Sequence, residues 1–485
     1  MPNGKLDRLG QSLAHAVANH NPVDHRLDGM LARPGERDGL DAQFDDARLA
    51  LALLALLAAA SAAAAAPFFL PTGPEVHNTG DPRVRTDSQG GVHMVYPLVA
   101  SAGAVYGYCP AGCASADDVW TVVFPTDDFG AVHNAMLALD ANDRPYLLFA
   151  TYDSVIYAEC SGDCRQGGSW SGARIFHHDG DWELTGDAFT LDPQGRPRFL
   201  MHAYQAYLGL FAPEPGTRLF ACDANCQDGD AWRVSTISEQ SWLEPTFRYD
   251  ARGVAHVATV IPVDDQELVA YLRCEADCGN EQVDNWPGLG LAYAFSDVYV
   301  AEVHPAVTMD LTPQGGVRLA FLGAEGETRY LAYYECDAAC TAEDARGWFG
   351  MGLLSSEDSD LGDGIALALD RHGRPRLAYT VSGSILLAYC DGDCVGRTGA
   401  DDWALAKGEL GDEIPADDIF LYHNCTVGFW FLRQPSVAIG ANGLPVIAYR
   451  AEDISGGWTS PDPTKPACVA GVDMTMTRLA VLDSY

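Results

Sequence analysis

The chain repeats one short pattern of apolar and polar positions along its length. The segments LALDANDRPYLLFAT from Leu137, FTLDPQGRPRFLMHA from Phe189 and LALDRHGRPRLAYTV from Leu367 show it most clearly. In each, an alternating segment meets a tight polar turn with Gly or Asn, and a second segment rich in β-branched and aromatic residues follows. This is the pattern of a β-hairpin.

Weaker copies start at Arg83, Phe247, Thr308 and Val437, which brings the number of units to seven. An aspartate at the start of a tight turn bonds its own backbone, so we interpret the recurring turn aspartates as structural rather than catalytic. The predicted turn anchors of the seven units are, in order, Asp87, Asp140, Asp192, Asp250, Asp310, Asp370 and Gly440.

The second half of the unit also repeats. A third apolar segment runs into a C-x-x-x-C pair in six units, and a tryptophan then opens a fourth segment, as in WTVVFPT from Trp120. Four strands per unit, seven units and almost no helical periodicity predict an all-β fold, a seven-bladed β-propeller over residues 67–485. The tryptophan is expected to pack between blades.

The seventh unit stops after its third strand, TRLAVLD from Thr477. The segment FFLPTGP from Phe68 resembles VVFPTDD from Val122, which is the fourth strand of the first unit. We therefore predict that an N-terminal strand completes the last blade. Such closure removes the sheet edges that an open array would expose.

The cysteines indicate an oxidising compartment, because an even number at repeated spacing is typical of disulfides. We expect one short intra-blade disulfide in six blades, between Cys109 and Cys113, Cys160 and Cys164, Cys222 and Cys226, Cys274 and Cys278, Cys336 and Cys340, and Cys390 and Cys394. Zinc sites and redox-active dithiols are the alternatives. The two remaining cysteines, Cys425 and Cys468, fall in two long segments of the seventh unit, so a disulfide between them is expected.

An apolar run, LALALLALLAAASAAAAA from Leu49 to Ala66, ends in small residues and is typical of a signal peptide cleaved near residue 66. Residues 1–66 are therefore expected to lie outside the fold, and the mature chain to be secreted, periplasmic or at the cell surface, without a membrane span. An uncleaved N-terminal anchor is the alternative. Because residues 1–48 are long and acidic for a leader, translation is expected to start downstream of Met1.

The formal net charge is −37, from 67 acidic and 30 basic residues. Such a balance repels nucleic acid and anionic membranes, so neither is an expected partner. It favours solubility, cation binding or basic partners, and a solvated acidic surface is its simplest explanation. We expect a monomer.

Loop length is concentrated on one side of the predicted propeller. We call the side that carries the loops from strand four to the next strand one, and from strand two to strand three, the first face; the C-x-x-x-C elements lie on the opposite, second face. The long segments 177–185, 203–216 and 292–303 all fall on the first face. Long loops on a rigid scaffold are where function is usually found, so we expect the binding side there.

Oxygen-bearing side chains recur six residues before the turn anchors, where the innermost strands begin at the mouth of a central channel. Such a ring is compatible with a hard cation such as Ca²⁺ and equally with a solvated mouth. The candidate residues of this column and its neighbours are Asp81, Asn134, Asp187, Glu244, His304, Asp363 and Gln434.

A second candidate cluster is the acidic segment around Trp182, with Asp179, Asp181 and Glu183. An aromatic platform beside carboxylates suits sugars, and paired carboxylates are the machinery of glycoside hydrolysis. An acidic surface loop is the alternative explanation.

The repeat D-x-x-G-x-P-x-(apolar)-x-Y, followed by Y-A-x-C-x-x-x-C and Trp, resembles repeats of uncharacterised exported bacterial β-propeller proteins, which are loosely similar to the sialidase-like (BNR-type) group. The resemblance covers roughly 68–485 and implies the fold rather than an activity. The Asp-box order S-x-D-x-G-x-x-W is not matched, and the obvious arginines, Arg144, Arg196 and Arg374, fall in turns on the second face.

These observations predict a secreted, non-catalytic binding or interaction propeller that presents its first face to a carbohydrate, a protein or a cation. The alternative is an extracellular carbohydrate-active enzyme, a glycoside hydrolase or lyase, that uses acidic residues of the same face. A structural surface component is a third class. No cofactor is expected other than Ca²⁺ at the channel mouth.

Overall fold

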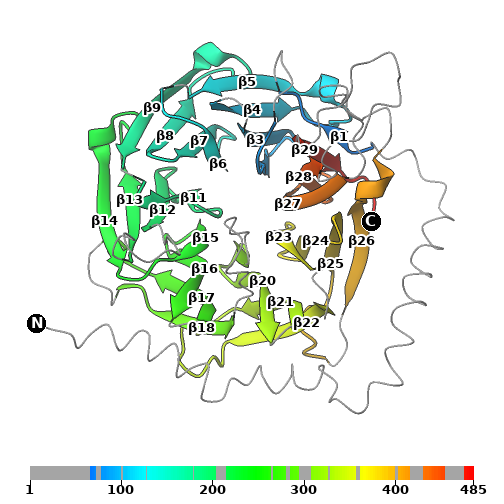
Figure 1. Cartoon of the computed structure of the whole chain (residues 1–485). Coiled ribbons are helices and arrows are strands. Elements are labelled where there is room, and N and C mark those ends of the chain that lie inside the picture. Colours follow the sequence, from blue (N-terminus) through cyan, green and yellow to red (C-terminus); the bar gives the residue numbers. More distant parts are fainter. Residues whose placement is uncertain are drawn as a thin grey trace, which may run out of the picture.

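Seven antiparallel sheets stand around one axis in the computed structural model (Figure 1). This confirms the predicted seven-bladed β-propeller. The residues that the structure describes are 66–72, 78–99, 102–126, 128–178, 180–203, 215–263, 266–279, 285–293, 307–325, 328–356, 361–398, 402–414, 430–453 and 474–485.

The blades are numbered in chain order, and each is a four-stranded meander except blade 3, whose innermost strand is divided in two. Blade 1 contains β2 (Arg83–Thr86), β3 (Val92–Leu98), β4 (Gly103–Cys109) and β5 (Trp120–Pro125). Blade 2 contains β6 (Val132–Leu139), β7 (Pro145–Thr151), β8 (Ser154–Cys160) and β9 (Trp170–His177). Blade 3 contains β10 (Trp182–Glu183), β11 (Phe189–Leu191), β12 (Pro197–Ala203), β13 (Thr217–Cys222) and β14 (Trp232–Ser238).

Blade 4 contains β15 (Leu243–Tyr249), β16 (Ala255–Val263), β17 (Gln266–Cys274) and β18 (Gly288–Tyr293). Blade 5 contains β19 (Val307–Leu311), β20 (Val317–Glu325), β21 (Thr328–Cys336) and β22 (Trp348–Ser356). Blade 6 contains β23 (Leu361–Leu369), β24 (Pro375–Val381), β25 (Ser384–Cys390) and β26 (Trp403–Glu409). Blade 7 contains β27 (Trp430–Ile439), β28 (Pro445–Asp453), β29 (Met474–Val481) and β1 (Phe68–Phe69). Helical elements among the described residues are 3-10 turns of three residues each.

The N-terminal strand closes the ring, as the sequence predicts. In β1, Phe68 pairs with Leu479 and Phe69 with Arg478 of β29. The ring of Phe69 packs against Trp430 at 5.3 Å, and the Arg478 guanidinium lies 4.2 Å from the Phe69 ring centroid. The first strand of the fold therefore completes the last blade and leaves no blade without its fourth strand.

The turn anchors bond their own backbone, which confirms their structural role. Asp140 Oδ1, for example, accepts the backbone N–H groups of Asn142 at 2.8 Å and Arg144 at 3.0 Å. Arg144 lies in this turn between β6 and β7, which is on the second face as predicted, and its side chain pairs with Asp140.

The anchor predicted for blade 5 is wrong. Its turn is closed by Thr312, whose backbone N–H donates to Gly316 O at 2.8 Å and whose hydroxyl accepts the Gly316 N–H at 2.9 Å. Asp310 instead lies within β19, opposite Arg318. The sequence DLTPQGG contains an aspartate two residues before the true anchor, and this aspartate is predicted as the anchor because the other units, except the seventh, have aspartate there.

Neighbouring blades are joined by the cysteine loops and the tryptophans that follow them. The six predicted disulfides are present, one in each of blades 1 to 6. The indole N–H of Trp232 donates to the Cys226 carbonyl at 2.8 Å, and its ring meets Tyr157 of the preceding blade edge-on at 5.5 Å. The pairs Tyr106–Trp170, Tyr271–Trp348 and Tyr333–Trp403 repeat this contact. Four of the six tryptophans thus pack between blades, as predicted, whereas Trp120 of blade 1 is 54% exposed and Trp286 packs edge-on against Trp242. Cys425 and Cys468 lie outside the described residues.

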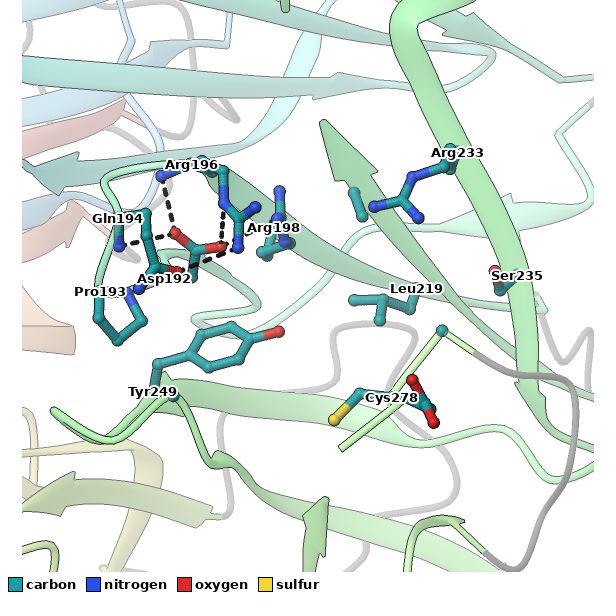
Figure 2. A pocket seen from close by; sticks show the side chains of 14 residues that line it. Asp192, Pro193, Gln194, Arg196, Arg198, Leu219, Arg233, Ser235, Tyr249 and Cys278 are labelled. Carbon is teal, nitrogen blue, oxygen red and sulfur yellow. Dashed lines mark hydrogen bonds and ion pairs between the residues drawn. The ribbon is translucent and has the colours of Figure 1, made fainter. Parts of the chain in front are cut away.

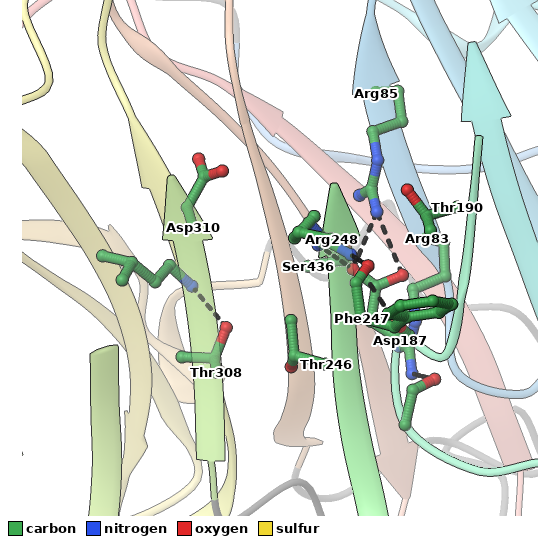
Figure 3. A network of polar contacts seen from close by, with 12 residues as sticks. Arg83, Arg85, Asp187, Thr190, Thr246, Phe247, Arg248, Thr308, Asp310 and Ser436 are labelled. Carbon is green, nitrogen blue, oxygen red and sulfur yellow. Dashed lines mark hydrogen bonds and ion pairs between the residues drawn. The ribbon is translucent and has the colours of Figure 1, made fainter. Parts of the chain in front are cut away.

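The innermost strands are also tied to each other by side-chain hydrogen bonds to neighbouring backbone, and Figure 3 shows the residues Ser436, Thr308 and Asp310 that accept them. Ser436 of blade 7 accepts the Val84 N–H of blade 1 at 3.1 Å. Thr308 and Asp310 of blade 5 accept backbone N–H groups of blade 6 at 3.2 and 3.0 Å. Buried backbone groups near the axis therefore find partners across blade boundaries.

The predicted export segment falls on residues 49–66, of which the structure describes only Ala66. Within the described part of the chain, no helix has the length and apolar character needed to cross a membrane.

Candidate functional site

The predicted column at the start of the innermost strands corresponds to a recurring β-bulge. The pairing between the first two strands slips at this point in blades 2, 4, 6 and 7. Four residues of the column have a left-handed backbone: Gly186 (φ 66°), Glu244 (φ 47°), Gly364 (φ 106°) and Gln434 (φ 52°). Glycine adopts this conformation freely, whereas other residues pay about 1–3 kcal/mol and persist in it mainly at functional sites. Glu244 and Gln434 are therefore the notable members of the column.

Gly186 is required where it stands, because blade 3 meets blade 4 backbone to backbone there. A Cβ atom on Gly186 would lie 2.6 Å from the Glu244 carbonyl carbon and 2.6 Å from the Pro245 oxygen. Asp187 then pairs with β15 of blade 4, through Asp187 N–H to Pro245 O at 3.0 Å and Phe247 N–H to Asp187 O at 3.1 Å. The innermost strand of blade 3 thus crosses to the next blade between β10 and β11, with Glu183 before the crossing and Asp187 within it.

The side chains of four blades meet around this crossing. Arg83 of blade 1 donates to the Gly186 carbonyl at 3.0 Å, and Asn134 of blade 2 donates to the Leu184 carbonyl at 3.0 Å. Arg83 and Glu244 are 8% and 6% exposed. We call Asp81, Arg83, Asn134, Glu183 and Glu244 the mouth cluster. Four of these five residues were predicted from the sequence as candidates.

Burial shifts two carboxyl groups of the mouth cluster toward the neutral form near pH 7. Burial raises the pKa of Glu244 to about 8; Arg83 acts against this shift, whereas Glu183 and Asp81 add to it. Burial raises the pKa of Glu183 to about 7. A group that titrates in this range can donate a proton at neutral pH, as general acids do.

The backbone of Glu244 is fixed from the side of blade 3. Its N–H donates to the Thr185 hydroxyl at 3.2 Å, and that hydroxyl lies 2.9 Å from His202 Nε2. His202 is buried, and burial lowers its pKa to about 4, so it is neutral at pH 7. A chain of polar contacts therefore supports the strained residue, which is typical of a preorganised site.

Two aromatic residues belong to the first-face segments around Glu183. Trp182 directly precedes Glu183, and the Arg218 guanidinium lies 3.7 Å from the Trp182 ring centroid. Tyr152, in the loop between β7 and β8, is 77% exposed. A Cβ atom on Gly180 would lie 2.5 Å from the Tyr152 ring, so this ring packs against the segment that leads to Trp182. Asp181 of that segment is exposed.

Blade 7 contributes charged groups at the same rim. Arg450 pairs with Asp81 at 3.2 Å and lies 3.7 Å from Glu452, which also pairs with Arg433 at 3.2 Å. Gln434, next to Arg433, is buried at 2% exposure. The predicted candidate Asp81 is therefore an ion-pair partner rather than an isolated carboxylate.

Asp187 differs from the other candidates because two arginines neutralise it. Arg85 of blade 1 pairs with it at 2.7 Å, and Arg248 of blade 4 also donates to it (Figure 3). Burial acts to raise the pKa of Asp187, but Arg248 and Arg85 hold it well below the ordinary value. Asp310 lies nearby, and burial raises its pKa against the effect of Arg248. We call Arg85, Asp187, Arg248 and Asp310 the axial cluster; it ties blades 1, 3 and 4 together.

The remaining candidates are outside what the structure describes. These are Asp179, His304 and the side chain of Asp363. Counting from the true blade 5 anchor, Thr312, the column position of that blade is residue 306 rather than His304. Among the described residues, no group of three or more His, Cys, Asp or Glu side chains is placed to hold a metal ion. Ca²⁺ at the mouth stays a prediction.

Sequence reasoning missed Arg83, Arg450 and Tyr152. Both arginines lie inside strands, where a charged residue in an alternating pattern usually means an exposed position. Tyr152 occupies a short turn, TYDS, whose length gave no signal. Only the closure of the ring brings these positions to one rim.

Comparison with known proteins supports the fold and gives no information about activity. No protein-family model and no curated protein matches the chain. Among solved structures, the polysaccharide lyase Uly1 is 11% identical with a TM-score of 0.44, over 86% of this chain and 92% of its own. Hadza microbial sialidase Hz136 is 11% identical with a TM-score of 0.40, over 63% and 64%. The GH93 α-L-arabinofuranosidase of Fusarium graminearum is 9% identical with a TM-score of 0.39, over 86% and 97%. A loose similarity to sialidase-like propellers is thus found, and it carries no argument about activity.

Proposed function

We propose that this chain is an exported propeller that binds carbohydrate at the mouth cluster on its first face. The observation that carries the proposal is the pair of buried carboxyl groups beside Arg83: with pKa values of about 8 and about 7, Glu244 is largely protonated and Glu183 about half protonated at pH 7. A protonated carboxyl both donates and accepts hydrogen bonds, and Arg83 and Asn134 add donors. Sugar hydroxyls need such mixed partners.

The aromatic rings support the same ligand class. Trp182 directly precedes Glu183 in the chain, and the exposed Tyr152 packs on the segment that leads to Trp182. Binding sites for small ligands combine apolar or aromatic walls with a few convergent polar groups, and this rim offers both. A basic protein or a cation, which the net charge alone would favour, does not require protonated carboxyl groups.

Catalysis at the same mouth is the second candidate, and the pKa of Glu244 favours it. A carboxyl group protonated at neutral pH is the general acid of a glycoside hydrolase, and a second, ionised carboxylate about 5–5.5 Å or 6.5–9.5 Å away serves as nucleophile or base, respectively. Glu244 would then protonate the leaving oxygen, and the ionised form of Glu183, about half of the population at its pKa of about 7, would act as the second group. A left-handed backbone at Glu244 fits a residue retained for chemistry at a cost in stability.

A glycan array and a polysaccharide turnover screen on the purified protein test both candidates. We expect Arg83→Met to weaken glycan binding at least tenfold, because it removes a buried donor of the mouth. The matched control is Glu275→Gln, on the second face with a side chain 71% exposed, which should bind as the wild type does.

Glu244→Gln separates binding from catalysis. Glutamine has nearly the shape and hydrogen-bonding capacity of protonated glutamate, so this variant should retain binding, and it should lose turnover only if Glu244 is a proton donor. Absence of binding to every neutral and acidic glycan tested, or binding that Arg83→Met leaves intact, would contradict the proposed site.

A further inference from the structure

A cavity lies on the second face, between blades 3 and 4 (Figure 2). It has a volume of about 530 Å³. Its walls include the guanidinium groups of Arg196, Arg198 and Arg233, the ring of Tyr249 and the side chain of Leu219. None of these residues belongs to the site on the first face.

Blade 6 carries the same arrangement of charges beside blade 7. In blade 3, Asp192 pairs with Arg196 at 2.7 Å and with Arg198 at 2.9 Å. In blade 6, Asp370 pairs with Arg374 at 2.6 Å and with Arg376 at 3.4 Å. The two arrangements are equivalent, residue by residue, because both come from the repeat D-x-x-G-R-P-R.

The equivalent position at blade 6 is filled by the chain itself. Tyr485, which follows the third strand of blade 7, stacks on Tyr389 with ring centroids 4.1 Å apart. The Arg376 guanidinium lies 5.3 Å from the Tyr485 ring centroid. A tyrosine ring is therefore a fitting occupant for this arrangement of arginines.

Blade 3 differs at one pair of positions. Arg198 faces Ala221, whereas Arg376 faces Tyr389. Ala221 in turn faces Arg233, whereas Tyr389 faces Ala404. The small Ala221 leaves room for a ring, and Arg233 offers a guanidinium where blade 6 offers an aromatic platform.

The arginines of the cavity are already neutralised, which argues against an anion as the ligand. Arg198 pairs with Asp223 at 2.6 Å, and Arg233 pairs with the same carboxylate at 2.8 Å. A guanidinium that is paired at its edge keeps its flat faces free for stacking on an aromatic ring. Arg233, with a side chain 70% exposed, is accessible for such a contact.

We propose that this second-face cavity is a docking site for a tyrosine side chain presented by a partner polypeptide. The ring would lie between Arg198, Arg233 and Tyr249, in the manner of Tyr485 against blade 6. This inference is independent of the proposed carbohydrate site.

The probe is the peptide AVLDSY, the sequence of residues 480–485, with AVLDSA as its control. Titration of the purified protein should show binding of AVLDSY and at least tenfold weaker binding of AVLDSA. Ala221→Tyr installs the residue on which Tyr485 stacks in blade 6, so it should strengthen AVLDSY binding by about threefold or more. Tyr485→Ala should raise the number of bound peptides, because it opens the equivalent position at blade 6.

Arg233→Ala keeps the proposal falsifiable if Ala221→Tyr fails to fold, since Arg233 is exposed. Loss of one guanidinium–ring contact should weaken binding by about threefold or more. Equal binding of AVLDSY and AVLDSA, or an affinity unchanged in both Ala221→Tyr and Arg233→Ala, would overturn the site. So would a glycan that binds the wild type and loses affinity in Ala221→Tyr while the peptide does not bind.

Discussion

Two buried sites combine glutamate with arginine in opposite ways. Where the ring closes, Arg478 is fully buried and forms two contacts of 2.7 Å with Glu409 of blade 6, and the Tyr449 hydroxyl also donates to this carboxylate. At the mouth, Arg83 donates to the Pro82 and Gly186 carbonyls, and Glu244 is protonated near neutral pH.

The difference separates structural charge from functional charge. A buried ion pair with matched partners is costly to break but does little else. A buried carboxyl group without a matched cation costs stability, keeps its proton and so remains available for a ligand. Arg478 and Glu409 therefore belong to ring closure, and Glu244 belongs to a site.

The largest expected effect is at the closure. Arg478→Met removes the partner of Glu409 and leaves a buried carboxylate unpaired, which should lower the free energy of unfolding by about 3–5 kcal/mol. Urea denaturation measures this change. Arg346→Met, whose side chain is 71% exposed beside Asp344, is the matched control and should change stability by less than about 0.5 kcal/mol. A loss below about 1 kcal/mol in Arg478→Met would show that β1 holds the ring without this pair.

The axial cluster should behave like the closure rather than like the mouth. Asp187→Asn removes the counter-charge of Arg85 and Arg248, so we expect unfolding to become easier by about 2–3 kcal/mol. Asp181→Asn, an exposed carboxylate of the same segment, serves as control. If Asp187→Asn leaves stability unchanged but abolishes glycan binding, the sequence-based prediction of Asp187 as a ligand-binding residue stands and the structural role does not.

Much of this fold follows from local signals. The turns, the cysteine loops and the tryptophans repeat along the chain, and each is satisfied within its own blade or by the next blade. Closure by Phe68 and Phe69 was predictable because the last unit lacks a strand. The error at Asp310 arose where two polar residues compete for one turn, and only hydrogen bonding to Gly316 decides for Thr312.

The mouth was less predictable, because its residues come from several blades. Spacing placed Asp81, Asn134 and Glu244 in one column, but it could not show that Arg83 of blade 1 reaches Gly186 of blade 3. Nor could it say that burial would keep Glu244 protonated while Arg85 and Arg248 ionise Asp187. Desolvation and ion pairing depend on the closed ring, not on the repeat.

Stability should depend on pH through the mouth. In the unfolded chain Glu244 ionises near its ordinary pKa of 4.5, whereas in the folded protein it holds its proton up to about pH 8. Between these values the folded state binds one proton more, so the free energy of unfolding falls as pH rises, and the loss is complete above the folded-state pKa. The limiting slope for one proton is about 1.4 kcal/mol per pH unit.

Comparison with Glu244→Gln isolates this contribution, because the variant cannot titrate at that position. From about pH 6.5 to 8 the wild type should lose about 1–2 kcal/mol more than Glu244→Gln in parallel urea titrations. Curves that stay parallel across this window would mean that Glu244 ionises at its ordinary pKa and that the mouth is not built around a neutral carboxyl group.

The smallest effect should come from Glu244→Gly, and its sign is the informative part. Glycine removes both the left-handed strain at φ 47° and the buried carboxyl group, and the blades 3 and 6 already carry Gly186 and Gly364 in this column. Relief of about 1–3 kcal/mol of strain exceeds the roughly 0.5–1 kcal/mol by which glycine favours the unfolded chain, so the variant should be more stable by about 1 kcal/mol.

The converse change, Gly364→Ala, places a Cβ atom 3.0 Å from Gln434 Oε1 at φ 106° and should destabilise the protein. A residue that lowers stability and is nevertheless present is expected where it serves a ligand, so Glu244→Gly should also lose glycan binding. If instead Glu244→Gly proves less stable than the wild type, Glu244 supports the fold as Arg478 does, and the contrast between the closure and the mouth disappears.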